Sequence, residues 1–239
     1  MGEGCGNDAE LMNYVSSVNI ACGYHAGDQE TMKRTVDLAL EKGVAIGAHP
    51  SYPDRENFGR SDMDLPPAEV YKLVEDQIFA LSLYCDKAGA TLCHVKPHGA
   101  LYNQSARSPE IAQTIAKAVS DVNQKLILFG LSGSHSIAEA KKIGLQTASE
   151  VFADRTYQTD GTLTPRSVPN ALITDEDTAV TQVMDMIKYS RVRSTEAIMI
   201  PIIAETVCIH GDGEHALEFA RLIHHSLIEN GIEIGATNG

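Results

Sequence analysis

The sequence predicts an α/β fold built around a parallel sheet, and three observations support this. Short apolar runs alternate with longer amphipathic runs along nearly the whole chain of 239 residues. Capping residues precede many amphipathic runs, and glycines follow them. Strict alternation of strand and helix is the pattern of parallel strands joined by right-handed crossovers. We expect one (β/α) barrel domain over residues 1–239, with an open doubly wound sheet as the alternative.

The apolar runs and the amphipathic runs give the expected elements in order. The expected strands are Val18–Cys22, Val44–His49, Thr91–Lys96, Lys125–Gly130, Gln146–Phe152, Ala197–Ile203 and Thr206–His210. The expected helices are Gln29–Lys42, Pro67–Ala88, Pro109–Val119, Ser136–Ile143, Asp175–Tyr189 and Glu214–Glu229. The stretch Ala153–Thr174 lacks a regular pattern, and a loop of that length in a compact domain is usually functional.

Local signals support the helix boundaries. Ser108 precedes Pro109 as an N-cap before a proline in the first turn. Asp28 and Asp212 also stand where N-caps belong, and Thr174 starts a capping-box pattern.

Composition excludes several classes of protein. The net charge of −13 argues against nucleic acid or an anionic membrane as the main partner. The first residues lack the basic and apolar regions of a signal peptide. No apolar run approaches the roughly 18 residues that span a bilayer. We therefore expect a cytoplasmic, soluble protein.

Polar side chains gather where the expected strands end. The carboxyl ends of parallel strands meet at one edge of the sheet, which is where ligands bind, so these groups are expected to share a rim. Four strands deliver a histidine, and a fifth delivers acidic and basic groups. The residues are His25 and Asp28, His49, His98, then Glu150, Asp154 and Arg155, and finally His210 and Asp212.

Each of these residues also has a purely structural interpretation. One histidine at a strand end is more often hydrogen-bonded than catalytic, and Asp28 or Asp212 alone is more often a helix cap. Four histidines on one rim favour a functional site that performs acid–base chemistry or binds a metal such as zinc or manganese. The metal candidates are His25, His49 and His98, although the sequence has no HExxH motif.

Other chemistries have weaker support. The sequence has no GxSxG, P-loop or GxGxxG motif, so nothing in it indicates a serine hydrolase or a nucleotide site. Lys96, Arg155 and Arg166 are able to pair with a substrate carboxylate.

Five motifs together resemble the LamB/YcsF family. They are NIACGYHAGD, GAHPSYPDRENFGR, VKPHGALYN, VFADRTYQTDGTLTPR and CIHGD, in this order and spacing, and the likeness covers nearly the whole chain. The family includes one component of the bacterial ATP-dependent 5-oxoprolinase.

The resemblance implies a fold and a reaction. The fold is a seven-stranded, deacetylase-like, TIM-like (β/α) barrel. The reaction converts 5-oxo-L-proline, ATP and water into L-glutamate, ADP and phosphate, with 5-oxoprolinase subunits B and C as partners. ATP is the implied co-substrate, accompanied by Mg²⁺ and held with help from the partner subunits. The sequence leaves open whether the chain also forms a homo-oligomer.

The resemblance also implies which residues serve the site. The catalytic candidates are His25, Asp28, His49, His98, Asp154, His210 and Asp212. The substrate-binding candidates are Glu3, Lys96, Tyr102, Asn103, Glu150, Arg155 and Arg166. Family members usually begin with a strand that carries an Asp-Leu-Asn-x-Asp-x-Gly-Glu motif. Only Met1-Gly2-Glu3-Gly4 matches its end here, so we expect the first barrel strand to be truncated.

Two other functions remain open at this stage. One is a stand-alone metal-dependent amide or N-acetyl hydrolase, which rests on fold analogy. The other is a non-catalytic scaffold that binds a lactam and leaves the chemistry to its partners.

Overall fold

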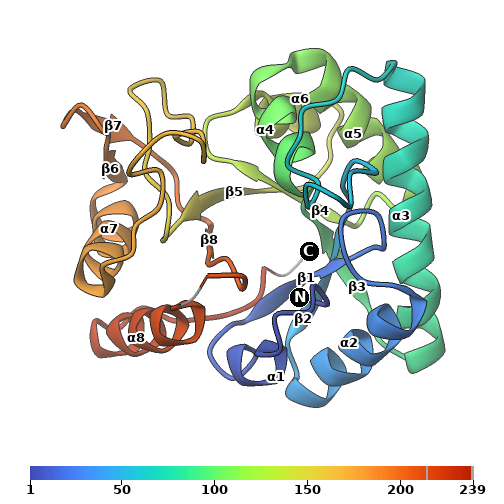
Figure 1. Ribbon diagram of the computed structural model, residues 1–239, viewed down its shortest axis with the longest axis horizontal. Coiled ribbons are helices and arrows are strands. Elements are labelled where there is room, and N and C mark those ends of the chain that lie inside the picture. Colours follow the sequence, from blue (N-terminus) through green and yellow to red (C-terminus); the bar gives the residue numbers. More distant parts are fainter. Residues whose placement is uncertain (214, 238–239) are drawn as a thin grey trace.

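In the part of the chain that the structure describes, six parallel strands form the main sheet, in the order β1-β2-β3-β4-β5-β8. A computed structural model describes residues 1–213 and 215–237. The sheet curves into a half-barrel with helices around its outside (Figure 1). The strands are β1 (Ser17–Ala21), β2 (Ala45–His49), β3 (Leu92–Val95), β4 (Ile127–Leu131), β5 (Thr147–Phe152) and β8 (Thr206–Cys208).

Helices connect the strands and cover the convex face. The crossover helices are α2 (Gln29–Lys42), α3 (Pro67–Ala88), α5 (Pro109–Val122), α6 (His135–Lys142) and α7 (Glu176–Tyr189), and α8 (Ala216–Glu229) follows the last strand. Two short helices, α1 (Asp8–Leu11) and α4 (Gly99–Arg107), complete the set. Within the described ranges, no helix is both long and apolar enough to cross a membrane.

The capping signals are confirmed at two helices and wrong at two others. The Asp28 carboxylate accepts the Thr31 N–H at the start of α2, and Ser108 caps α5. At α7 the cap is Asp175, so the prediction of Thr174 is wrong by one residue. The residue before α8 is His215, so Asp212 is not its cap. The predicted first residue of that helix, Glu214, lies outside the described residues.

The prediction of an α/β fold with a parallel, barrel-like sheet is confirmed, but the predicted number of seven strands is wrong, because the sheet has six strands within the described residues. The predicted strand Ala197–Ile203 instead contains β7 (Met199–Pro201), which pairs antiparallel with β6 (Arg191–Arg193). A short turn closes this pair, with the Ser194 N–H donating to the Ile198 carbonyl at 2.8 Å. Antiparallel neighbours need only a tight turn, whereas a parallel strand needs a long crossover. β7 therefore pairs with its neighbour β6 and does not join the parallel sheet.

The two edges of the half-barrel, β1 and β8, are not paired with each other in the described part of the chain. The backbone of Met1 lies along β1, accepting the Ala21 N–H at 3.0 Å and donating to the Asn19 carbonyl at 2.8 Å. This pairing fixes the start of the chain beside the strand and places Glu3 near the end of β1.

A buried histidine fills the inside of the sheet below its rim. The His94 ring on β3 stacks on Phe129 of β4, with centroids 4.2 Å apart. A Cβ atom at Gly47 would clash with the His94 ring, so β2 needs a glycine at this position. The apolar side chains of α2, α3 and α5 pack behind these strands and make the largest core cluster.

Candidate functional site

A cavity of about 790 Å³ occupies the concave side of the half-barrel. Residues of β1, β4, β5 and β8 line its walls, and the loops after β2, β3 and β5 line its mouth. The expected rim of polar side chains therefore borders a real cavity. Of the predicted site residues, the lining includes Glu3, His49, Lys96, His98, Tyr102, Asn103, Glu150, Arg155, Arg166, His210 and Asp212.

Three of the four predicted histidines form one cluster. His25 follows β1, His49 is the last residue of β2, and His98 precedes α4. The rings of His25 and His98 stack with centroids 3.8 Å apart, and His49 stands edge-on to both. All three are buried. Gly59 approaches so closely that a Cβ there would stand 3.0 Å from His98 Cδ2.

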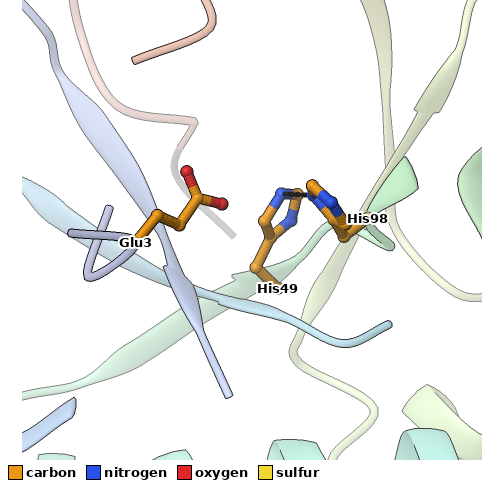
Figure 2. A group of neighbouring side chains, drawn as sticks. All are labelled: Glu3, His49 and His98. Atoms are coloured by element: carbon orange, nitrogen blue, oxygen red, sulfur yellow. Dashed lines mark hydrogen bonds between the residues drawn. The ribbon is translucent and has the colours of Figure 1, made fainter. Parts of the chain in front are cut away.

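Hydrogen bonds hold each ring of this cluster in place. His49 Nδ1 lies 2.6 Å from the Lys96 carbonyl oxygen, and His98 Nε2 lies 2.8 Å from the Phe58 carbonyl oxygen. The remaining nitrogens of the two rings, His49 Nε2 and His98 Nδ1, are 3.0 Å apart (Figure 2). Burial lowers the pKa of His98 to about 3 and that of His49 well below its usual range. Both rings are therefore neutral at pH 7.

Glu3 brings a carboxylate to the cluster. Its Oε1 lies 3.1 Å from His25 Nε2, while His25 Nδ1 contacts Ser51 Oγ at 2.9 Å. Burial would raise the pKa of the Glu3 carboxyl, but the amino terminus and the His25 hydrogen bond lower it to about 2. Figure 2 shows Glu3 on the side of His49 opposite His98.

A second histidine–carboxylate pair stands at the end of β8. Both oxygens of Asp154 lie within hydrogen-bonding distance of His210 Nδ1, at 2.8 and 3.0 Å. The His210 backbone N–H also donates to Asp154. Burial raises the pKa of Asp154, but the charge and hydrogen bonds of His210 outweigh this and lower it to about 2. A carboxylate that holds Nδ1–H leaves Nε2 free for proton transfer.

Asp212 pairs with an arginine that the sequence interpretation did not single out. Arg60 Nη2 lies 2.5 Å from Asp212 Oδ2, and the Arg60 guanidinium also lies over the Phe58 ring. Arg60 ends the GAHPSYPDRENFGR motif, so its place in a motif was the available signal. Only the folded chain brings it to the partner 152 positions away.

Deeper in the cavity, a buried ion pair joins two strands. Lys96 Nζ lies 2.7 Å from Glu150 Oε1 and 2.9 Å from Cys208 Sγ, and it faces the Phe152 ring. Burial alone would lower the pKa of Lys96, but Cys208 and Glu150 raise it above its usual range. Lys96 is therefore charged, and its charge is already neutralised by Glu150. Cys208 is the member of this group that sequence reasoning did not select.

Not every predicted residue joins the site. Asp28 is exposed and caps α2, and it is absent from the cavity lining. Arg155 does line the cavity, but its guanidinium donates to the carbonyls of Thr164 and Ala171 and so organises the loop after β5. Asn103 and Arg166 line the cavity.

One group in the described part of the chain has the composition of a metal site. Glu3, His49 and His98 each offer a ligand atom, and these atoms lie within 4.8 Å of one another. The sequence proposed His25 in place of Glu3. In the structure, His25 contacts the Glu3 carboxylate and so stands behind the candidate ligands.

The fold and the site together define an α/β half-barrel protein with a cavity of histidines, carboxylates and basic groups at its strand ends. A model of the LamB/YcsF family matches residues 1–239, and the chain belongs to this family. The resemblance seen in the five motifs is thereby confirmed.

Two relatives carry informative names. A Geobacillus kaustophilus protein, named as the A subunit of 5-oxoprolinase, is 56% identical over 227 residues, covering 95% of this chain and 89% of its own length. The crystal structure of a lactam utilization protein from Thermus thermophilus superposes with a TM-score of 0.91 at 41% identity, covering 97% of this chain and 93% of the other.

Proposed function

We propose that this chain is a component of a 5-oxoprolinase and that its cavity binds the lactam. The observation that carries this proposal is the 56% identity, over 95% of the chain, to a relative named as the A subunit of 5-oxoprolinase. That name implies further subunits, and we assign the partners as subunits B and C. We also place the reaction, which consumes ATP with Mg²⁺, in the cytoplasm.

The reaction requires a proton acceptor for the water that adds to the carbonyl carbon and a proton donor for the ring nitrogen that leaves it. Phosphorylation of the lactam oxygen by ATP makes the ring carbonyl carbon electrophilic. One water adds to this carbon, the C–N bond breaks as the ring nitrogen accepts a proton, and a second water hydrolyses the acyl phosphate. The partner subunits help to bind the ATP in this proposal.

His210 is the proton carrier that the geometry favours. Asp154 holds its Nδ1, and His210 lines the cavity, where its Nε2 is free to take a proton from water and return it to the ring nitrogen. Asp154 acts through His210 and is therefore a positioning residue.

The substrate carboxylate has a candidate partner at the mouth of the cavity. Lys96 already forms an ion pair with Glu150, and Arg60 forms one with Asp212, so neither is free to bind the substrate carboxylate. Arg166 lines the cavity and makes no side-chain hydrogen bond to any described residue, so its guanidinium is available for a bidentate contact. Tyr102 and Asn103 complete the proposed binding wall, and Arg155 shapes it through its hydrogen bonds to the loop after β5.

Reconstitution of the complex tests the proposal. The chain is mixed with subunits B and C, 5-oxo-L-proline and Mg²⁺-ATP, and glutamate and ADP are measured together. We expect equal amounts of both products, and none when the chain is omitted.

Three outcomes would contradict the proposal, and a fourth would contradict the role of His210 within it. Failure to form a complex, or glutamate formation without ATP, excludes this role, and amide hydrolysis by the chain alone would favour a stand-alone hydrolase. Full turnover with a His210→Gln chain would favour a scaffold.

A further inference from the structure

The two hydrogen bonds to backbone carbonyls fix the tautomers of His49 and His98. A carbonyl oxygen only accepts, so His49 Nδ1 and His98 Nε2, at 2.6 and 2.8 Å from such oxygens, must each carry a hydrogen. In a neutral imidazole the other nitrogen then carries a lone pair. These other nitrogens are His49 Nε2 and His98 Nδ1.

The two lone pairs point to a cation. His49 Nε2 and His98 Nδ1 are only 3.0 Å apart, so without a positive charge between or beside them two acceptors would face each other. Both rings are buried, and burial disfavours an imidazolium at either one. A metal ion that accepts both lone pairs removes the conflict without adding a proton.

The surroundings match those of a bound metal. Metal-ligating histidines almost always donate their second ring N–H to a carbonyl or carboxylate, and both rings do so here. Glu3 supplies a charged third ligand within 4.8 Å, itself hydrogen-bonded by His25. All three candidate ligands line the cavity, so further coordination positions face a space for water or substrate.

We propose that Glu3, His49 and His98 bind one divalent first-row transition-metal ion, with Mn²⁺ and Zn²⁺ as the leading candidates. Two histidines and one carboxylate with open positions are an established ligand set for such ions. At a metal–nitrogen distance of about 2.1 Å, the observed separation of the two nitrogens gives an angle of about 90° at the metal. An angle of this size suits an octahedral ion such as Mn²⁺ better than a tetrahedral one.

The proposal does not depend on 5-oxoprolinase activity, so its test measures binding to the isolated full chain. The protein is stripped with a chelator and titrated with Mn²⁺ or Zn²⁺ by calorimetry, and the bound metal is counted by elemental analysis. We expect one ion per chain. The visible spectrum of the Co²⁺-loaded protein reports nitrogen ligation independently of any variant.

Variants assign the ligands. His98→Ala and Glu3→Gln should each weaken binding by more than about 10-fold, which is the lower end of the loss from outer-shell changes. The matched control is His135→Ala, an exposed histidine on α6 that is absent from the cavity lining. It should bind with unchanged affinity.

If His98→Ala fails to fold, the near-isosteric Glu3→Gln and the Co²⁺ spectrum still decide the question. Stoichiometric binding that persists in both ligand variants would overturn the assignment. The absence of a stoichiometric ion, together with an NMR signal for one proton shared by His49 and His98, would replace the metal by a charged histidine pair.

Discussion

The two sides of the rim use histidine in different ways. On the side of β1–β3, His25, His49 and His98 are buried and packed on one another, and backbone carbonyls orient His49 and His98. On the side of β5–β8, His210 is partly exposed and is oriented by the Asp154 carboxylate. A carbonyl fixes a tautomer without adding charge, which suits a ligand, whereas a carboxylate stabilises an imidazolium, which suits a proton carrier. The same residue type at equivalent strand ends therefore favours two chemistries.

The largest expected effect is on kcat, and it tests His210 as the proton carrier on the β5–β8 side of the rim. His210→Gln in the assembled complex should lower kcat by about 10²- to 10⁴-fold, the range typical of a lost general acid–base group. Steady-state release of glutamate and ADP measures it.

Asp154→Asn sharpens the comparison, because it keeps the shape but permits the wrong tautomer of His210. It should lower kcat while leaving the KM for 5-oxo-L-proline nearly unchanged. A loss confined to KM in both variants would show that this side only binds substrate.

The next effect tests the link between the two sides. Lys96, which directly follows β3, and Glu150 on β5 form a buried ion pair that lines the cavity. Lys96→Met leaves Glu150 buried without a partner and should cost about 3–5 kcal/mol of unfolding free energy. Urea denaturation measures the loss.

A matched control is Lys72→Met, which breaks exposed pairs with Glu75 and Asp76 and should lower the free energy of unfolding much less. Equal losses in the two variants would mean that the buried pair is no more important than a surface pair.

A smaller effect concerns the pH dependence of the free energy of unfolding and the buried His94 on β3. Burial lowers the pKa of His94 to about 3, below the ordinary value of 6.5. Between these values the unfolded chain binds more protons than the folded chain, so His94 makes the free energy of unfolding fall as the pH falls. His94→Gln should flatten this dependence between pH 6.5 and 3.

Chemical denaturation at several pH values measures the slope rather than the absolute stability, so a packing defect in the variant does not obscure the result. His135→Gln, at an exposed site, should leave the slope unchanged. The prediction is wrong if both variants give the slope of the parent chain.

The smallest effect is expected at Asp28, which lies outside the cavity. Asp28 shares a motif with His25 but caps α2 on the surface. Asp28→Ala should lower the free energy of unfolding modestly, as other N-cap replacements do, and should leave kcat unchanged. A large loss of turnover without a loss of stability would show that Asp28 has a catalytic role, as the sequence analysis predicted.

Much of this arrangement could be predicted from local patterns. The bounds of α2 and α3 were predicted to the residue, because helical periodicity, a helix-starting residue and a C-terminal glycine agree at each. The four histidines at strand ends could be located because a parallel sheet sends its strand ends to one edge. The helix α4 was missed, since it begins directly after His98 without a separate capping signal.

The sequence by itself determined the alternation of strand and helix, the family and the residue types at the rim. Only the tertiary structure decided that β7 leaves the sheet, that Arg60 meets Asp212 and that Glu3 replaces His25 in the candidate ligand set with His49 and His98. The reason is physical: periodicity and capping act between residues a few positions apart. The contacts that divide the rim into a ligand side and a proton-carrier side join residues such as Asp154 and His210, 56 positions apart, and depend on how the strands curve around the cavity.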